Sequence, residues 1–277
     1  MRLTFHAQQL VAGKPFNVTS YPVESAVPSA TIAEADGVRY LKLGTPWVQG
    51  AMRIDKPFAI ELEYVRRMMV WLLLRQGGDL GRGHAVQFGL GAGTITRFCH
   101  GKLHLQTTAV EINPSVIAAC QTWFHLPAAA PRLAIVEQNA AVFSGDPARA
   151  GSVQVLCVDL YDHEAAAPAL DSAAFYSDCR CLLSDDGVMT VNVFGRQSNI
   201  SLSARRIATV FGEAQVRVME PTREGNSVVV AMKGGLFPDR SLLAARARNI
   251  ETRFHLPARE WLDMLKPLPP APPTAVN

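Results

Sequence analysis

Short apolar segments alternate with helical patterns along most of the chain, and this alternation constrains the fold more than any other feature. Strands are predicted at Ala85–Phe88, Thr107–Val110, Leu133–Val136, Val153–Val158 and Val188–Phe194, with helical segments between them. This order is typical of a mostly parallel sheet with helices on both faces. Two closing strands, Gln215–Met219 and Ser227–Met232, predict an antiparallel hairpin at one edge. We therefore expect a doubly wound α/β fold with a seven-stranded, mostly parallel sheet.

The first 57 residues follow a different pattern. Thr31–Ala35 and Val38–Leu43 are short alternating runs on either side of Asp36-Gly37, a pair that favours a two-residue hairpin turn. Trp47–Met52 is a candidate third strand. We expect residues 1–57 to form a small antiparallel β unit that precedes an α/β domain over residues 58–235.

Helical patterns are also found at the two ends of the α/β domain. Apolar residues from Phe58 to Leu73 recur at steps of three and four, which predicts one amphipathic helix. Ser241–Asn249 predicts a helix in a C-terminal extension over residues 236–277. Lys266–Pro273 is rich in proline, and we expect this tail to form neither helix nor strand.

Composition excludes several classes of protein. An apolar content of 48% is high enough to bury a core, so the chain is not disordered overall. The net charge of +3 is small and scattered, which argues against nucleic acid as a partner. The apolar run Met68–Leu74 is too short to span a membrane, and mixed polar residues after Met1 predict no signal peptide. Five cysteines without a C-x-x-C pair predict no metal site, no disulfide framework and a reducing cytoplasm.

A glycine-rich turn follows the first strand of the α/β domain. Gly89, Gly91 and Gly93 form a G-x-G-x-G pattern beyond the carboxyl end of the strand, where ligands of such sheets bind. Glu111 ends the next strand, 22 positions after Gly89, a spacing typical of a carboxylate that binds ribose hydroxyls. Because Thr94 replaces the last glycine of a dinucleotide fingerprint, the pattern favours an adenosyl-sulfonium ligand. The alternative is that the glycines serve only a tight turn.

Polar residues also follow the third and fourth strands. Asn139 is a candidate to contact adenine, a candidate helix N-cap, or both. Three carboxylates, a phenol and an imidazole lie close together at Asp159, Tyr161, Asp162, His163 and Glu164. Such a group can hold an ammonium ion and accept its proton, and Asp159, beside the buried strand, is the best candidate. The alternative for His163 and Glu164 is a solvated acidic loop.

These motifs together resemble the spermidine synthase (polyamine aminopropyltransferase) family. The segments that carry the resemblance are Trp47–Met52, Gly89–Gly93, Val110–Pro114 and Asp159–Asp162, and the likeness covers roughly residues 30–235. It implies a class I methyltransferase-like fold, decarboxylated S-adenosylmethionine as co-substrate and a diamine such as putrescine as acceptor. It also implies methylthioadenosine as product and a homodimer.

The resemblance assigns roles to individual residues. Gln49, Glu111 and Asn139 would bind the nucleoside beside the glycine loop, Asp159 would be the catalytic residue, and Asp162 would match a second aspartate of the family. Three positions differ from the family. Ala92 stands where the family has an aspartate for the ammonium group of the donor, and Asn139 also replaces an aspartate. A Tyr-His/Gln-Glu motif is replaced by Ile60–Leu62 or Leu62–Tyr64.

These differences motivate a hypothesis and two alternatives. Glu61, Glu63 or Asp162 would have to face the pocket to replace the carboxylate missing at Ala92. One alternative is a methyltransferase that uses intact S-adenosylmethionine, since Ala92 leaves room for the carboxylate of that donor. The chain lacks the Asn/Asp-Pro-Pro-Tyr pattern of amino-group methyltransferases. The other alternative is a nucleoside-binding homologue without catalysis.

Overall fold

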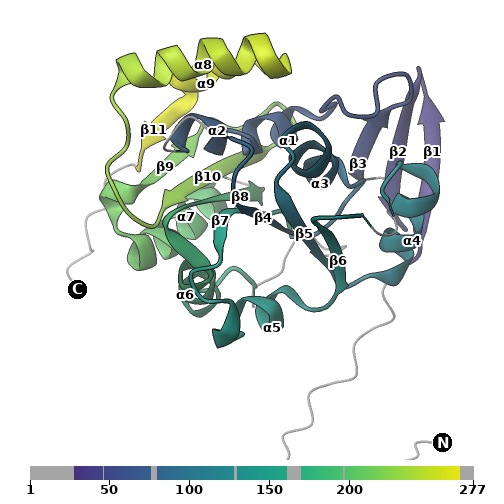
Figure 1. Cartoon of the computed structure of the whole chain (residues 1–277), viewed down its shortest axis with the longest axis horizontal. Helices are drawn as coiled ribbons and strands as arrows, with labels where there is room; N and C mark the ends of the chain where they lie inside the picture. The colour runs from purple at the N-terminus through teal and green to yellow at the C-terminus, as the bar shows by residue number, and fades with distance from the viewer. Residues whose placement is uncertain are drawn as a thin grey trace, which may run out of the picture.

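The computed structural model describes residues 28–45, 47–75, 80–127, 130–160, 170–195 and 197–268. The N-terminal strands β1 (Ala30–Ala35), β2 (Val38–Leu43) and β3 (Val48–Arg53) form a separate antiparallel sheet in the order β1-β2-β3 (Figure 1). Asp36 and Gly37, between β1 and β2, have φ angles of 50° and 73°, the left-handed pair that a tight hairpin requires. The predicted small β unit is confirmed.

The main sheet has the predicted mostly parallel arrangement. Its strands run in the order β11-β9-β10-β8-β7-β4-β5-β6, and the five strands from β8 to β6 are parallel. The bounds are β4 (His84–Phe88), β5 (Gln106–Glu111), β6 (Leu133–Glu137), β7 (Val153–Val158), β8 (Leu183–Phe194), β9 (Val216–Met219), β10 (Asn226–Met232) and β11 (Leu265–Pro267). Strand β8 begins at Leu183 rather than Val188, because Leu183 also pairs with Val153 of β7.

Within the described residues, the sheet has one strand more than the sequence predicts. Leu265–Pro267 forms β11, which pairs antiparallel with β9 at the sheet edge. The expectation that Lys266 and Pro267 belong to neither helix nor strand is therefore wrong. Proline lacks a backbone N–H but is tolerated in an edge strand, where one side of the backbone has no neighbouring strand. The rest of the proline-rich segment, from residue 269 on, lies outside the described residues.

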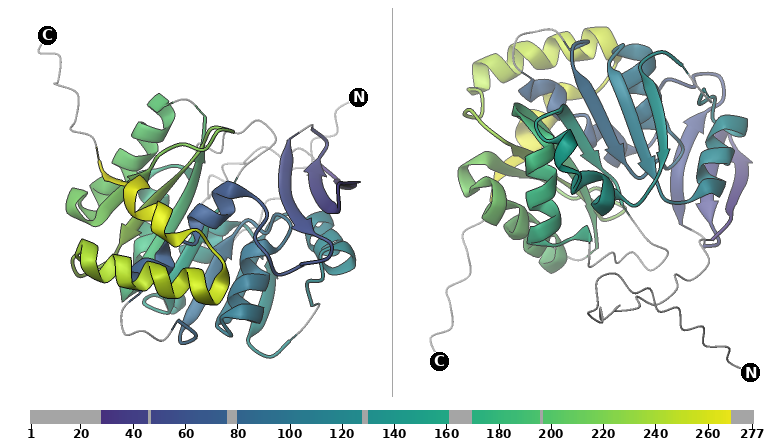
Figure 2. Two further views of the ribbon diagram at one scale, coloured as in Figure 1. Left: turned by 90° about the horizontal axis from the view of Figure 1, so that it is seen from above. Right: turned by 60° about the horizontal axis from the view of Figure 1, so that its bottom comes forward.

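Helices cover both faces of the main sheet (Figure 2). Their bounds are α3 (Thr94–Arg97), α4 (Pro114–Trp123), α5 (Ala140–Ser144), α6 (Ala173–Leu182), α7 (Gln197–Phe211), α8 (Arg240–Phe254) and α9 (Ala258–Met264), with a π turn at Phe98–Lys102 and 3₁₀ turns at Pro147–Arg149 and Glu213–Gln215. Successive strand residues face opposite sides: Val155 packs in one core cluster and Leu156 in the other.

The helix predicted from Phe58 to Leu73 is broken and starts later. The structure has α1 (Glu63–Met68) and α2 (Trp71–Leu74), and Leu62 has an extended backbone with φ −77° and ψ 136°. Met68 and Leu72 are nevertheless fully buried. Apolar periodicity reports which residues face the core, and a tight turn at Met69 preserves that burial without a continuous helix. The later start lets α1 pack against β8 and β10.

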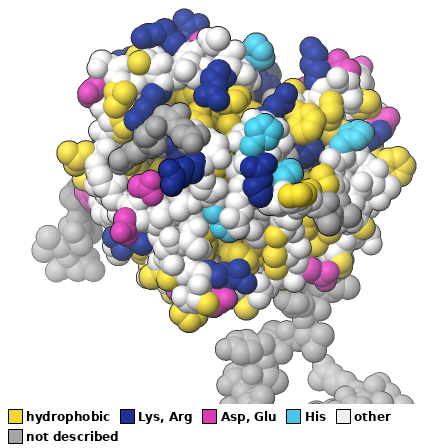
Figure 3. All heavy atoms as spheres, in the orientation of Figure 1, with side chains coloured by type: hydrophobic (Ala, Val, Ile, Leu, Met, Phe, Trp, Pro, Cys, Tyr) yellow, Lys and Arg dark blue, Asp and Glu magenta, His cyan; other side chains and the backbone are white. Residues whose placement is uncertain are grey.

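The surface combines charged and apolar side chains. In Figure 3, lysine and arginine side chains lie at several separate places on the visible face, among histidine, acidic and hydrophobic ones. Among the described residues, no helix is both long and apolar enough to cross a membrane.

Candidate active site

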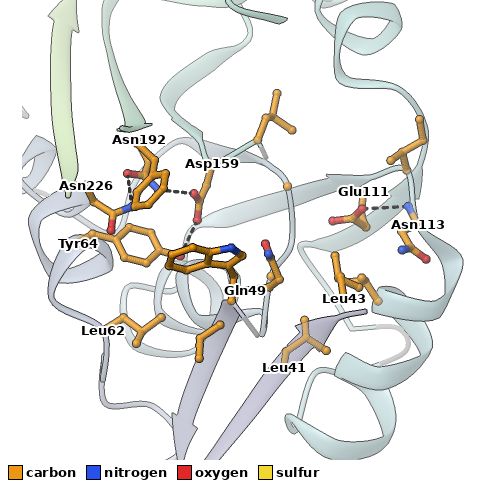
Figure 4. Close-up of a pocket in the computed structure, with 18 of the residues that line it drawn as sticks. Leu41, Leu43, Gln49, Leu62, Tyr64, Glu111, Asn113, Asp159, Asn192 and Asn226 are labelled. Carbon is orange, nitrogen blue, oxygen red and sulfur yellow. Dashed lines mark hydrogen bonds between the residues drawn. The ribbon is translucent and has the colours of Figure 1, made fainter. Parts of the chain in front are cut away.

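A cavity of about 660 Å³ lies beyond the carboxyl ends of the parallel strands. One part of it, the glycine-loop half, lies over the ends of β4, β5 and β6. The other part, the Asp159 half, lies over the ends of β7, β8 and β10 and against the start of α1. Figure 4 shows Glu111 and Asn113 in the first half, and Tyr64, Asn192 and Asn226 around Asp159 in the second. The volume is that of a typical small-molecule site.

The N-terminal sheet closes one side of the cavity by packing on the glycine loop. A Cβ atom on Gly50 of β3 would lie 2.4 Å from the backbone nitrogen of Ala92, and one on Gly91 would lie 2.8 Å from the carbonyl oxygen of Gln49. Both distances are too short for real atoms, so glycine is required at these contacts. Trp47 also packs edge-to-face on Phe194, with ring centroids 5.9 Å apart, and both line the cavity.

Gly89 lets the ends of β4 and β7 approach each other. It has a φ of 80°, and a Cβ atom there would lie 2.1 Å from the carbonyl oxygen of Asp159. Gly89 and Gly91 line the cavity, whereas Gly93 does not. Gly93 precedes α3 in a left-handed conformation. The loop therefore has glycine where the backbone is crowded or left-handed, which accounts for the spacing seen in the sequence.

Glu111 lies at the end of β5, and backbone N–H groups hold its carboxylate. Its Oε2 accepts a hydrogen bond from Leu90 N at 2.8 Å and its Oε1 accepts one from Asn113 N at 2.9 Å. Burial raises the pKa of Glu111, and the backbone hydrogen bonds oppose that rise. Each oxygen can accept a further hydrogen bond, so the carboxylate can bind two neighbouring hydroxyl groups of a ligand.

Asn139 is the N-cap of α5. Its Oδ1 accepts a hydrogen bond from Ala141 N at 2.8 Å, which confirms the N-cap interpretation. The residue also lines the glycine-loop half of the cavity. The cap leaves the Nδ2 group of Asn139 available to a ligand. Contact of Asn139 with adenine stays a prediction.

Asp159 follows β7, and three side chains from distant segments surround its carboxylate (Figure 4). Asn192 Nδ2 donates to Oδ1 at 2.8 Å, and the Tyr64 hydroxyl donates to Oδ2 at 3.3 Å. Asn226 Nδ2 in turn donates to Asn192 Oδ1 at 3.1 Å. Asn226 thus orients the amide of Asn192, and Asn192 holds the carboxylate.

The environment of Asp159 makes it a stronger base than an ordinary aspartate. Burial raises its pKa to about 6, with a smaller contribution in the same direction from Glu111. The hydrogen bonds from Asn192 and Tyr64 oppose this rise. The carboxylate of Asp159 is therefore ionised at neutral pH. Its pKa is nevertheless closer to the pKa of an amine than the pKa of an exposed aspartate is.

Glu61 and Glu63 line the cavity, but both are ion-paired. Glu61 accepts from Arg53 at 2.8 Å, and Glu63 pairs with Arg67 on the same helix. Their carboxylates are therefore less available to hold an ammonium group than the sequence suggests. Tyr161 and Asp162, the other two candidates for binding the acceptor, lie outside the described residues.

Sequence reasoning did not assign Tyr64, Asn192 or Asn226 to the site. The family resemblance places the tyrosine of its motif at Ile60 or Leu62, whereas the structure places the phenol of Tyr64 on Asp159. Asn192 does carry a sequence signal: it is a polar residue between Val191 and Val193, near the carboxyl end of an apolar strand. Asn226 has no comparable signal, since asparagine after glycine is ordinary in a turn.

No protein-family model matches the chain, but individual relatives do. A polyamine aminopropyltransferase of Chromobacterium violaceum is 32% identical over 254 residues, which are 91% of this chain and 95% of the relative. A polyamine aminopropyltransferase of Neisseria meningitidis is 33% identical over 213 residues, 76% of this chain and 79% of the relative.

The chain belongs to the polyamine aminopropyltransferase family. This membership confirms the resemblance predicted from the sequence. A probable spermidine synthase from Corynebacterium glutamicum has a similar fold, with a TM-score of 0.69 and 16% identity over 90% of this chain and 95% of its own.

Two further structures share this fold. Human methyltransferase-like protein 13 in complex with SAH gives a TM-score of 0.64 and 19% identity over 78% of this chain and 98% of its own. A spermidine synthase in complex with the transition-state analogue AdoDATO gives 0.56 and 18% over 82% of this chain and 89% of its own. The methyltransferase-like fold expected for a polyamine aminopropyltransferase is thereby confirmed.

Proposed function

We propose that this chain transfers an aminopropyl group from decarboxylated S-adenosylmethionine to an amine such as putrescine and releases methylthioadenosine. The observation that carries the proposal is the carboxylate of Asp159, held by Tyr64 and Asn192 at one end of a cavity. The carboxylate of Glu111, held by backbone N–H groups, lies at the other end. A nucleoside and an amine can thus be bound side by side, which is the arrangement that the transfer needs.

The glycine-loop half would hold the donor. Glu111 accepts hydrogen bonds from the two ribose hydroxyls, and Gln49 and Asn139 contact the rest of the nucleoside. Gly89 and Gly91 leave the loop backbone open to the ligand, so the sulfonium can lie close to it. The donor is a co-substrate that leaves as methylthioadenosine, and we expect the transfer to need no metal.

In the reaction, the lone pair of the acceptor nitrogen attacks the methylene group next to the sulfonium. A C–N bond forms, the C–S bond breaks, and its electron pair stays on sulfur. The nitrogen loses one proton, which passes to Asp159 directly or through water. The pKa of an amine is about 10.4, far above the ordinary aspartate value of 3.8. Because burial raises the pKa of Asp159, it lowers the free-energy cost of moving a proton from the amine to the carboxylate.

Tyr64, Asn192 and Asn226 would act as positioning residues. Tyr64 and Asn192 fix the plane of the carboxylate, and Asn226 acts on it only through Asn192. A fixed carboxylate can orient the ammonium, accept its proton as the nitrogen attacks, and stabilise the positive charge of the new amine.

The test is an assay of methylthioadenosine release from decarboxylated S-adenosylmethionine and putrescine. We expect turnover by the native chain and a loss of at least about 100-fold for Asp159→Asn, because the proton acceptor is removed. Unchanged transfer by Asp159→Asn would show that the assigned role of Asp159 is wrong. The matched control is Asp239→Asn, since Asp239 is an exposed N-cap of α8, away from the cavity, and asparagine caps as well as aspartate.

A methyltransferase activity is the second candidate, and one observation favours it. Ala92 is buried against Gly50, so the glycine loop contributes no carboxylate to hold the ammonium of the decarboxylated donor. Calorimetric titration with S-adenosylmethionine and with its decarboxylated form separates the two activities. Tighter binding of the carboxylated form would exclude aminopropyl transfer as the main activity.

We also propose that the chain works as a homodimer in a reducing cytoplasm. All five cysteines are free thiols, which fits that compartment. The family resemblance is the basis for the dimer. Sedimentation analysis of the purified chain tests the dimer, and fractionation of the source cells tests the compartment.

A further inference from the structure

Two consecutive arginines on α1 differ in their surroundings. Arg67 is buried, pairs with the carboxylate of Glu63 and donates to the carbonyl oxygen of Glu220. Arg66 is half-buried and lines the cavity. Tyr64, on the same helix, donates to Asp159, so α1 lies beside the Asp159 half of the cavity.

The guanidinium of Arg66 is incompletely hydrogen-bonded. Its Nη2 donates to the carbonyl oxygen of Glu61 at 2.6 Å, and its Nε is buried without a hydrogen-bond partner. Among the residues that the structure describes, no carboxylate lies within 4.0 Å of it as an ion-pair partner. Because Nε is buried, a carboxylate in the cavity would meet the Nη groups, with which it can form two parallel hydrogen bonds.

Arg66 has no ion-pair partner among the described residues of the cavity wall. Glu61 is neutralised by Arg53 and Glu63 by Arg67, which leaves the charge of Arg66 uncompensated. The unpaired carboxylates among the described lining residues of this half are Asp159 and Glu224, the latter exposed in the turn before β10. The site thus offers anionic groups for amines and one cationic group for an anion.

We propose that Arg66 binds a carboxylate of the acceptor, so that the acceptor is a diamino acid rather than a plain diamine. This inference rests on the proposed aminopropyl transfer. The reacting amine lies at Asp159, the carboxylate at Arg66, and the second ammonium group at Glu224. The bonds that form and break are those of the transfer described above, and no further reactant is needed.

Intact S-adenosylmethionine also has a carboxylate that an arginine could bind. The position of α1 in the fold favours the carboxylate of the acceptor instead. The strand order places β8 and β10 on one side of β7 and β5 on the other. The helix α1, which carries Arg66 and packs against β8 and β10, is therefore on the opposite side of Asp159 from Glu111, which would hold the ribose. A donor bound by Glu111 has its nucleoside remote from Arg66.

Matched substrates test the inference, because ornithine is putrescine with one added carboxylate. Transfer is measured for both acceptors with decarboxylated S-adenosylmethionine, for the native chain and for Arg66→Gln. We expect native kcat/KM to be at least about 10-fold higher for ornithine, since a bidentate ion pair is lost with putrescine. In Arg66→Gln that advantage disappears, mainly through KM for ornithine, while KM for putrescine changes less than about 3-fold.

Two controls accompany this comparison. Arg248→Gln removes an exposed arginine of α8 away from the cavity and should leave both acceptors unaffected. Arg66→Lys retains the charge without the planar pair of donors and should keep only part of the ornithine preference.

Each result decides the inference. A native preference for putrescine, or an equal loss for both acceptors in Arg66→Gln, overturns it. The inference is also overturned if Arg66→Gln weakens binding of S-adenosylmethionine but not of its decarboxylated form, because the carboxylate then belongs to the donor. Absence of transfer to any acceptor refutes the proposed function instead. Calorimetry of ornithine and putrescine on protein saturated with methylthioadenosine then decides whether Arg66 binds a carboxylate.

Discussion

The two halves of the cavity are built in different ways. In the glycine-loop half, backbone N–H groups of Leu90 and Asn113 hold Glu111. In the Asp159 half, side chains converge from segments 95 residues apart for Tyr64 and 33 apart for Asn192. The groups that hold Glu111 lie within 21 residues of it along the chain, whereas Asp159 is held only by residues far from it in the sequence.

The difference also affects which amino-acid substitutions each half of the cavity can tolerate. Gly89 and Gly91 cannot gain a Cβ atom without colliding with backbone atoms, so substitutions there strain the fold. Asn192, Asn226 and Arg66 touch the site through side-chain ends, which can be exchanged without moving the backbone. We infer that selectivity for the acceptor resides in the Asp159 half and that binding of the nucleoside resides in the glycine-loop half.

The largest effect is expected for Asp159→Asn, which should separate catalysis from binding. Transfer should fall by about 10²- to 10⁴-fold, while the Kd for methylthioadenosine changes little. Titration calorimetry beside the activity assay checks both. A parallel loss of nucleoside binding would contradict the division of the cavity into two independent halves.

The same variant should be more stable than the native chain at neutral pH. Because burial raises the folded-state pKa of Asp159 to about 6, above its ordinary value of 3.8, the folded state binds more protons between these values. Native stability therefore decreases as pH rises from about 4 to about 6. Asparagine has no charge to bury, so we expect a gain of about 1 to 2 kcal/mol at pH 7 and almost none at pH 4. Urea unfolding at both pH values measures it.

Glu111→Gln is expected to have the second-largest effect, and this effect should be confined to nucleoside binding in the glycine-loop half. Loss of the charged acceptor should weaken methylthioadenosine binding by roughly 10- to 100-fold, since hydrogen bonds to charged groups contribute about 1.5 to 3 kcal/mol. The rate at saturating donor should decrease far less. A reduced rate at saturation with unchanged affinity would reverse the roles given to the two carboxylates.

Asn192→Ala should have a moderate effect on rate and a distinct effect on pH dependence. The hydrogen bond from Asn192 lowers the pKa of Asp159, so its removal raises that pKa further. The acidic limb of the kcat/KM profile, expected near pH 6, should therefore move to higher pH. Asn226→Ala should move it in the same direction by less, because Asn226 acts only through Asn192. An unmoved limb would remove Asn192 from the positioning of Asp159.

The smallest effect is expected for Asn139→Ser, which isolates the capping role. Serine caps a helix about as well as asparagine, so stability should change by less than about 0.5 kcal/mol. A few-fold loss of nucleoside affinity with unchanged stability would support contact with adenine. Unchanged affinity would leave Asn139 as a cap of α5 alone.

The sequence was informative wherever a structural feature depends on residues that are close together along the chain. The Asp36-Gly37 turn, the cap at Asn139 and the loop from Gly89 to Glu111 all follow from local rules, and the structure has each of them. The break in the helix at Met69 was not predictable, because apolar spacing depends on burial alone. The strand at Leu265–Pro267 was missed because the exposed edge of β9, which accepts it, is defined only by the folded sheet.

By itself, the sequence determined a mostly parallel sheet, a glycine loop and carboxylates at Glu111 and Asp159, because periodicity and turn chemistry act over short distances. Only the tertiary structure decided what surrounds those carboxylates. It placed Tyr64 and Asn192 on Asp159, paired Glu61 with Arg53, and left Arg66 without a carboxylate among the described residues. Hydrogen bonds and ion pairs between distant side chains depend on distances that only the packing of strands and helices sets.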